Sequence, residues 1–182
     1  MIQVDSALNP GNSGGPIVNE DGDVVAVAQS RQGDNLGFGV SYRLTEKITQ
    51  SLIEDGKHTH PFIGIRTLEV SPFVSESIEY LEPYEGVLVT ETLEDGPASG
   101  GIFNTYTLLD EGEVEERGDM IVEIKGTPIR DNSDLSRALL LNYEGGEEVT
   151  VTVVTPDGYR EEKQFTLGSR PEPEQTELSI QE

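Results

Sequence analysis

A glycine- and proline-rich stretch near the start of the chain constrains the possible folds more than any other feature. Residues 9–16 read Asn-Pro-Gly-Asn-Ser-Gly-Gly-Pro, and they predict a tight turn because proline fixes φ and glycine tolerates a left-handed backbone. Ser13 has little side-chain bulk on either side. Backbone N–H groups can therefore converge beside its hydroxyl, as a nucleophilic serine with an oxyanion hole requires. The alternative is an ordinary glycine-rich surface loop, which a lone Gly-x-Ser-x-Gly match favours.

The residues that follow this loop predict a β-hairpin. Apolar residues 17–18 and 24–28 are separated by an Asp-Gly turn at residues 21–22, which is the pattern of two short strands joined by a tight connection. The loop therefore opens directly into paired strands, and the complete string at residues 9–16 is much more specific than the short motif alone.

The charge balance limits the possible partners. Lys and Arg number 12 against 35 Asp and Glu, which gives a formal net charge of −23. We do not expect nucleic-acid binding, because the acidic surface would repel phosphates. Binding to anionic membrane surfaces is disfavoured for the same reason. The acidic residues are spread along a chain that keeps its strand and helix patterns, which indicates a folded protein with an acidic surface. Such a surface suits high salt, where the screening length shrinks to about 3 Å, and a halophilic source is expected over an acidic protein from ordinary salt.

No cofactor or metal site is expected. The chain has no cysteine, so disulfides and thiolate ligands are unavailable. His58 and His60 are the only histidines; they could ligate a metal, but no third ligand is evident, and a solvated linker is the preferred interpretation. No apolar run approaches the ~18 residues of a membrane helix, and the first residues carry no signal-peptide pattern.

Hydrophobic periodicity divides the chain at a polar linker over residues 57–61. Before the linker, residues 1–4, 24–30 and 36–40 predict strands, and the glycines in the last of these indicate close approach of another backbone. Apolar residues at four-residue steps predict a helix over 42–55, with Ser41 as its N-cap and Gly56 as its terminator.

After the linker, the pattern predicts a small β-rich domain with two helices. The expected strands are 66–70, 86–90, 119–124, 149–153 and 160–167. The expected helices are one short turn at 97–102 and a longer helix at 132–142, capped at Asp131 or Asn132. Residues 103–117 are predicted to form an acidic surface insertion, and residues 169–182 a disordered acidic tail.

Several of these segments, in the right order, resemble the HtrA/DegP-type proteases, a family of trypsin-like serine endopeptidases. Residues 2–5, 9–16 and 36–40, followed by a helix, resemble the C-terminal half of the protease domain. Residues 62–65, 95–98, 118–121 and 132–141 resemble the PDZ domain that follows it in that family. The fold class implied is mainly β: a partial trypsin-like barrel with a helix over residues 1–57, then an α+β PDZ domain over 61–168.

The resemblance implies roles for the residues around the loop. Ser13 would be the nucleophile, and the N–H groups of Gly11 and Ser13 would form the oxyanion hole. The primary specificity pocket would be flanked by Ala28, Leu36, Gly37 and Phe38. The position six residues before Ser13 is Ala7, so an acidic pocket floor is not evident, and small apolar side chains at the cleavage site are expected.

The resemblance also implies a peptide-binding site in the second domain. Phe62, Ile63, Gly64 and Ile65 would form the loop whose N–H groups receive a peptide C-terminal carboxylate. Strand 65–70 would add the peptide as an extra strand, with Leu135 and Leu139 lining the groove. The alternative role of Phe62, Ile65, Leu135 and Leu139 is the hydrophobic core.

One departure from the family pattern separates two functional hypotheses. Trypsin-like chains supply the catalytic histidine and aspartate before the serine, whereas no histidine precedes Ser13. The chain is therefore interpreted as a fragment or as a decayed protease, and it is expected to be inactive by itself. The first hypothesis is a serine endopeptidase of protein quality control; the alternative is a PDZ adaptor with a non-catalytic protease remnant. A third possibility, cation binding by the acidic insertion, is less favoured than a solvated loop.

The expected partners follow from the same resemblance. They are unfolded or damaged proteins and peptide C-termini, with a homotrimer possible in the full-length protein. The implied location of that protein is the cell envelope or the outside of the cell.

Overall fold

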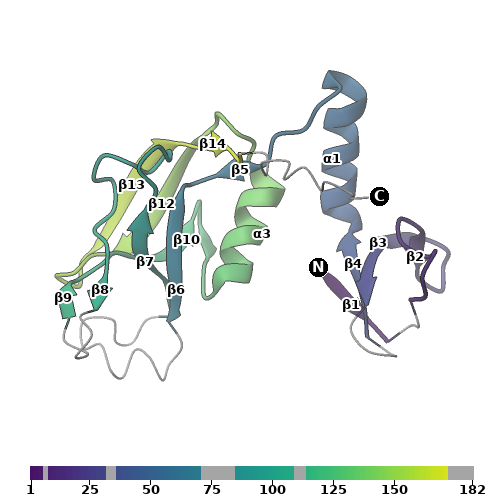
Figure 1. Ribbon diagram of the computed structural model, residues 1–182, viewed down its shortest axis with the longest axis horizontal. Helices are drawn as coiled ribbons and strands as arrows, with labels where there is room; N and C mark the ends of the chain where they lie inside the picture. The colour runs from purple at the N-terminus through teal and green to yellow at the C-terminus, as the bar shows by residue number, and fades with distance from the viewer. Residues whose placement is uncertain (6–7, 32–35, 71–84, 109–113, 172–182) are drawn as a thin grey trace, which may run out of the picture. The chain divides into compact units, whose positions relative to one another are not determined.

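The chain folds into two compact units, Met1–His58 and Thr59–Glu182, which Figure 1 shows as a small strand-and-helix unit and a larger unit. The computed structural model describes residues 1–5, 8–31, 36–70, 85–108 and 114–171. Strands dominate both units, and the predicted mainly β fold is confirmed. Several predictions lie outside the described residues: Ala7, the middle of the insertion at 109–113, and the tail at 172–182.

Unit 1 is a four-stranded antiparallel sheet with one helix. Its elements are β1 (Ile2–Val4), β2 (Pro16–Val18), β3 (Val24–Arg31), β4 (Gly37–Ser41) and α1 (Tyr42–Asp55). The strand order is β1-β4-β3-β2, so the predicted hairpin of β2 and β3 is confirmed, and its partners include Ile17 opposite Ala26. α1 packs against β3 and β4.

The limits of α1 agree with the sequence, but one of its caps does not. The helix ends at Asp55, and Gly56 adopts φ 72° while its N–H donates to the carbonyl of Leu52 at 3.2 Å, as expected of a left-handed terminating glycine. Ser41 makes no capping hydrogen bond with its side chain. The expected N-cap was wrong in this respect because Ser41 is still the last residue of β4, paired with Ala26.

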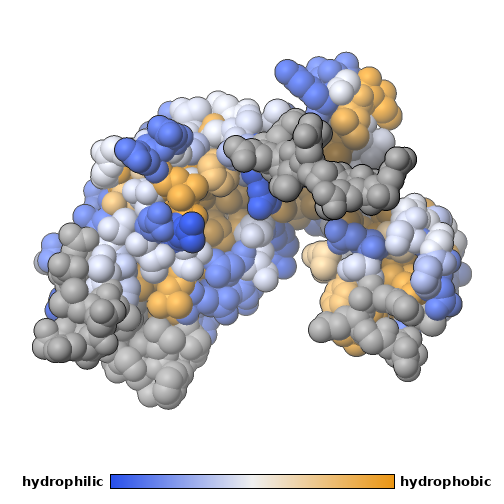
Figure 2. Space-filling view, in the orientation of Figure 1, coloured by the Kyte–Doolittle hydropathy of each residue, from blue (hydrophilic) through white to orange (hydrophobic). Residues whose placement is uncertain are grey.

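The core of unit 1 is thin. Ala26 and Ala28 are its buried apolar side chains within the described residues, and α1 contributes no buried residue. A Cβ at Gly39 would lie 3.0 Å from the backbone carbonyl oxygen of Val27 and 2.9 Å from the side-chain atoms Ala26 Cβ and Ile17 Cδ1, so the predicted close approach of another backbone at this strand is confirmed. Leu52 and Ile53 remain 49% and 79% exposed, and Figure 2 shows hydrophobic surface at that end of the helix.

Unit 2 is built on one large antiparallel sheet. Its elements are β5 (Pro61–Phe62), β6 (Ile65–Val70), β7 (Gly86–Thr92), β8 (Thr107–Leu108), β9 (Val114–Glu116), β10 (Met120–Ile124), β11 (Thr127–Pro128), α3 (Asn132–Asn142), β12 (Glu148–Val154), β13 (Arg160–Thr166) and β14 (Gly168–Ser169). The main order is β13-β12-β10-β7-β6, with β11 paired to β10. Among the described strands, β6 therefore lies at the edge of this sheet, and β5 pairs separately with β14.

The core of unit 2 lies between this sheet and α3. Val149, Val151 and Val153 alternate along β12 and are completely buried, as the period-2 pattern predicts. Leu135 and Leu139 of α3 join the same cluster. α3 begins after Asp131, whose side chain accepts a hydrogen bond from the N–H of Asp134, so the predicted cap and helix are confirmed.

Three expectations for unit 2 were wrong in part. Residues 97–102 form turns instead of a turn of helix. Phe103 and Tyr106, which were assigned to a polar surface insertion, are only 4% and 6% exposed. The prediction failed because most of the neighbouring residues in that segment are polar or acidic. Ser169 and Arg170, expected to belong to a disordered tail, are instead held in place, since Ser169 pairs with Pro61 and the N–H of Arg170 donates to the carbonyl of His60.

Candidate functional site

The loop that carries Ser13 is held to β3 by backbone hydrogen bonds. The N–H of Gly14 donates to the carbonyl of Ala28 at 2.8 Å, and the N–H of Ala28 donates to the carbonyl of Gly15 at 2.9 Å. Gly11 and Gly14 adopt φ values of 98° and 83°, a backbone conformation that disfavours other residues. The glycines of the motif therefore serve two tight turns that project Ser13 beside the strand.

A β-bulge in β3 lies next to the Ser13 hydroxyl. Ala28 pairs with Gly39 and Ser30 with Phe38, so Gln29 is the extra residue. The Ser13 Oγ donates to the Gln29 carbonyl at 3.4 Å, which is a long hydrogen bond. Within the described part of the chain, the Ser13 hydroxyl makes this one hydrogen bond. The hydroxyl is thus solvent-exposed and weakly tethered.

Within the described residues, two backbone N–H groups of the Ser13 loop have no backbone acceptor. The N–H groups of Asn12, Gly14 and Gly15 each donate to a backbone carbonyl. Across the described residues, those of Gly11 and Ser13 donate to none. Unpaired donors of this kind can stabilise an oxyanion where the loop is rigid.

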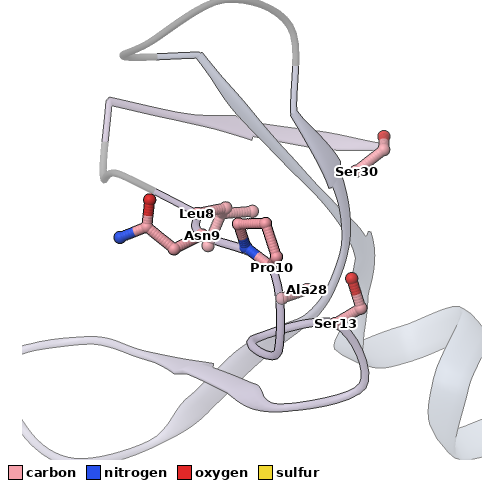
Figure 3. A pocket seen from close by; sticks show the side chains of 6 residues that line it. All are labelled: Leu8, Asn9, Pro10, Ser13, Ala28 and Ser30. Atoms are coloured by element: carbon pink, nitrogen blue, oxygen red, sulfur yellow. The ribbon is translucent and has the colours of Figure 1, made fainter.

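A cavity of about 220 Å³ adjoins Ser13. Figure 3 shows its lining side chains gathered between the loop and β3: Leu8, Asn9, Pro10, Ser13, Ala28 and Ser30. Of the predicted pocket residues, Ala28 lines this cavity directly, whereas Leu36, Gly37 and Phe38 are not among its lining residues. Gly37 lies behind it, because a Cβ there would meet the Leu8 side chain at 2.8 Å.

Leu8 is a lining residue that sequence reasoning missed. Its side chain contacts the Gly37 position and lines the cavity on the Ser13 side as well as a second one on the Gly11 side. The sequence carried only an indirect signal for this role: an apolar residue just before the Asn-Pro-Gly turn, with a glycine in a later strand. Among the described residues that line the cavity near Ser13, none carries a charged side chain.

In unit 2, the loop predicted to bind a carboxylate has its carbonyls and N–H groups turned in opposite directions. The Ile63 carbonyl accepts from the N–H of Ala98 at 3.0 Å, and the Gly64 carbonyl accepts from that of Leu93 at 2.8 Å. In a trans peptide the C=O and the following N–H point opposite ways. The N–H groups of Gly64 and Ile65 therefore point away from the turn at residues 93–98.

Gly64 enables this arrangement. It adopts φ 80°, and a Cβ there would lie 2.8 Å from the Cα of Gly96. The loop is thus pressed against the turn that carries Gly96 and Pro97. Phe62 lines a cavity on this side with Pro97 and Leu167.

β6 and α3 lie side by side after this loop, as Figure 1 shows. The Thr67 Oγ1 on β6 donates to the Asn132 Oδ1 at the start of α3 at 2.8 Å. Ile63, Leu135 and Leu139 are buried in the core, and Ile65 is partly buried against it. These side chains therefore do contribute to the hydrophobic core, which was the alternative role considered for them.

The first turn of α3 carries a buried carboxylate. Asp134 is 5% exposed, and it accepts hydrogen bonds from the guanidinium groups of Arg130, at 2.8 Å, and of Arg137. The hydrogen bond from Arg130 is the main reason that the pKa of Asp134 lies below its ordinary value, although burial opposes the shift. This cluster stabilises the start of the helix beside the candidate groove.

The histidines take part in local contacts. The His58 Nδ1 lies 3.1 Å from the Ser51 Oγ, which itself donates to the Lys47 carbonyl. Within the described residues, no group of three or more histidine, aspartate or glutamate side chains is placed to hold a metal ion. In the same part of the chain, neither helix has the length and hydropathy to cross a membrane.

Comparison with known sequences yields DegP-like relatives. No family model matches the sequence. The chain is 35% identical over 177 residues to the "Probable periplasmic serine endoprotease DegP-like" of Ectopseudomonas mendocina (strain ymp). It is 32% identical over 177 residues to "Protease Do-like 1, chloroplastic" of Arabidopsis thaliana. Each alignment covers 94% of this chain but only 34% and 38% of the relatives, so the chain spans little more than a third of their length.

Comparison with solved structures gives the same result. The HtrA-type protease AlgW with decapeptide matches with a TM-score of 0.64 and 27% identity, over 94% of this chain and 50% of that one. The serine endoprotease from Yersinia pestis matches with a TM-score of 0.56 over 93% and 52% of the two chains; at 23% identity it supports the fold alone. These matches confirm the resemblance and the mainly β fold predicted from the sequence.

Proposed function

On the premise that this chain is similar to part of an HtrA/DegP-type serine protease, we propose that it carries the nucleophile of a serine endopeptidase. Ser13 attacks the scissile carbonyl, and the N–H groups of Gly11 and Ser13 bind the resulting oxyanion. The observation that carries the proposal is the pair of unengaged N–H groups beside an exposed hydroxyl, within the described residues of the loop. Donors fixed before the reaction need no reorganisation in the transition state.

The proposed catalysis needs a base, and within the described residues the Ser13 hydroxyl is hydrogen-bonded to none. A serine hydroxyl is a weak nucleophile until an adjacent base accepts its proton, and the Ser13 hydroxyl donates to a backbone carbonyl. We therefore expect the chain to be inactive by itself. The histidine and aspartate would come from another part of a longer protein, with residues 1–57 as the C-terminal part of its protease domain.

The cavity beside Ser13 supports a preference for small apolar side chains at the cleavage site. Ala28 and Leu8 line it, and Gly37 leaves room for Leu8. Leu36, the residue before β4, and Phe38, within β4, are proposed to flank the pocket. The described lining residues include no carboxylate to pair with a basic substrate side chain.

Unit 2 is proposed to be a PDZ domain, residues 61–168, that binds substrate C-termini. The support is the loop of Phe62, Ile63, Gly64 and Ile65, whose outward N–H groups can receive a carboxylate, and the free edge of β6. A peptide added to β6 would contact α3 near Leu135 and Leu139. Such a domain would deliver unfolded or damaged proteins in quality control.

The location and assembly of the longer protein are proposed from its relatives. The name of the Ectopseudomonas relative places that protein in the periplasm, which supports the cell envelope as the site of action here. A homotrimer is the proposed assembly.

A PDZ adaptor is the second candidate function. It is favoured by the hydrogen bond of the Ser13 hydroxyl to Gln29, because a hydroxyl tethered to a carbonyl is not activated. Fluorophosphonate labelling of Ser13 distinguishes the two. The chain by itself should not react, whereas the protein from the complete reading frame should react and its Ser13→Ala variant should not. Absence of labelling in that protein would leave the adaptor, and labelling of the chain alone would overturn the expected inactivity.

A further inference from the structure

The turn between Leu93 and Ala98 supports the proposed carboxylate-binding loop from behind. The N–H of Leu93 donates to the Gly64 carbonyl at 2.8 Å, and the N–H of Ala98 donates to the Ile63 carbonyl at 3.0 Å. Each of these carbonyls shares a planar peptide unit with one of the N–H groups of Gly64 and Ile65. The position of the turn therefore sets the direction of both donors.

Pro97, within that turn, contacts both the loop and the strand that leaves unit 2. A Cβ at Gly64 would lie 2.9 Å from the Pro97 Cδ, and a Cβ at Gly168 would lie 2.6 Å from the Pro97 Cγ. Neighbouring atoms of one pyrrolidine ring thus pack against the loop and against β14. Gly168 has no positive φ, so the lack of space beside the ring, and not the backbone, requires a glycine there.

β14 is also held by neighbours other than Pro97. Gly168 lies opposite Phe62 in the pairing of β14 with β5, which Figure 1 shows side by side. A Cβ at Gly145 would lie 2.5 Å from the Ser169 Oγ, so the turn at Gly145 is pressed against the same strand. Because these contacts fix β14, extra bulk at Gly168 should be relieved by displacing the ring of Pro97.

We propose that Gly168 and Pro97 are positioning residues for the N–H groups of Gly64 and Ile65, so that the segment leaving unit 2 controls the affinity for a peptide carboxylate. This inference rests on the proposed peptide binding by unit 2. Pro97 lies on the carbonyl side of the loop, whereas the donors point to the other side. It therefore acts through the peptide planes, and a hydrogen bond to a carboxylate weakens steeply when its donor is misdirected.

The effect should be measurable by fluorescence anisotropy with the 182-residue chain. The probes are fluorescein-labelled peptides that end in valine, leucine or phenylalanine with free carboxylates, and the same peptides with amidated C-termini. Gly168→Ala should weaken binding of the free-carboxylate peptides about tenfold, the lower end of the range for one hydrogen bond to a charged group. Binding of the amidated peptides measures the part that does not depend on the carboxylate.

Gly118→Ala is the matched control for overpacking. Its Cβ would also lie 2.6 Å from a neighbouring atom, the Tyr106 N, but its close neighbours are Tyr106 and Val89 and not the turn that supports the loop. This variant should lose stability and keep its peptide affinity. Both variants would be compared at a temperature at which circular dichroism shows them folded.

Pro97→Ala completes a double-mutant cycle. Removing the ring leaves room for the added methyl group, so Gly168→Ala should weaken binding by less than about twofold in the Pro97→Ala background. A general loss of stability would instead give the same tenfold loss in both backgrounds. Pro97→Ala by itself should weaken binding, because the loop loses part of its support.

The outcomes separate this inference from the proposed function. Equal affinity of the Gly168→Ala variant and the unsubstituted chain, or an equal loss in Gly118→Ala, would overturn the positioning role and leave peptide binding intact. If every free-carboxylate peptide fails to bind the unsubstituted chain, peptide binding is wrong and the inference with it. Pro97→Ala only removes atoms, so unchanged affinity in that variant would refute the positioning role even if Gly168→Ala impairs folding.

Discussion

Replacing Lys163 with methionine should be among the most destabilising single changes in unit 2. The Lys163 Nζ lies 2.9 Å from the Asp119 Oδ2, with side-chain exposures of 15% and 0%. Asp119 also accepts hydrogen bonds from the N–H and the side-chain amide of Asn104. Lys163→Met keeps the apolar stem but leaves a fully buried carboxylate without its cation.

The exposed pair Arg66–Glu91 has the same separation, so comparing it with Lys163–Asp119 isolates the effect of burial on the energy of an ion pair. It is also separated by 2.9 Å, but its side chains are 71% and 54% exposed. The attraction between unit charges at that distance is about 6 kcal/mol at an effective dielectric constant near 20 and about 1.4 kcal/mol in bulk water. Breaking a buried pair from one side costs about 3–5 kcal/mol, whereas losing a surface pair costs about 1 kcal/mol or less.

Urea denaturation provides the test. Tyr106 and Tyr143 are buried in unit 2, so near-ultraviolet circular dichroism reports its unfolding. Lys163→Met should lower the free energy of unfolding by about 3–5 kcal/mol and Arg66→Met by about 1 kcal/mol or less. Adding Asp119→Asn to Lys163→Met should recover part of the loss because the uncompensated charge is gone. Equal losses for the two single variants, or no recovery in the double variant, would refute the argument from burial.

Three further changes test other parts of unit 2. Lys125, with φ 47° before Gly126, should be replaceable by asparagine with a gain of about 0.5–1 kcal/mol in urea denaturation, because asparagine tolerates the left-handed region. Gly118→Ala should cost about 1–3 kcal/mol by overpacking, since its Cβ would lie 2.6 Å from the Tyr106 N; thermal melts would show the loss. Because the pKa of Asp134 is lowered in the folded state, its ionised carboxylate stabilises the fold. This stabilisation is fully present above the ordinary pKa of 3.8 and is lost as pH falls through the folded-state pKa. Asp134→Asn should therefore flatten the acid limb of a curve of stability against pH.

Local patterns in the sequence were enough to predict much of the fold. The Asp-Gly turn predicts the β2–β3 hairpin, four-residue steps predict α1, and alternating valines predict β12. Each of these signals depends on residues a few positions apart. The tight turns of the Ser13 loop could also be predicted from the sequence, because a backbone at positive φ requires glycine at particular local positions.

Contacts between distant residues were not predictable in this way. Leu8 reaches the space left by Gly37 only because β1, β3 and β4 assemble as they do, and no short-range pattern marks it as a cavity residue. Phe103 and Tyr106 were assigned to the surface because acidic neighbours dominate their segment. Their burial is decided by the sheet that they pack against.

The sequence by itself determined the strand-and-helix order, the resemblance to HtrA-type proteases and the candidate nucleophile, since these depend on residue type and near spacing. Only the tertiary structure decided that, within the described residues, the N–H groups of Gly11, Ser13 and Gly64 donate to no backbone carbonyl. It also decided that Thr67 meets Asn132 across the candidate groove. A hydrogen bond or a free donor depends on what the rest of the fold brings within about 3 Å, and that is a property of the folded chain.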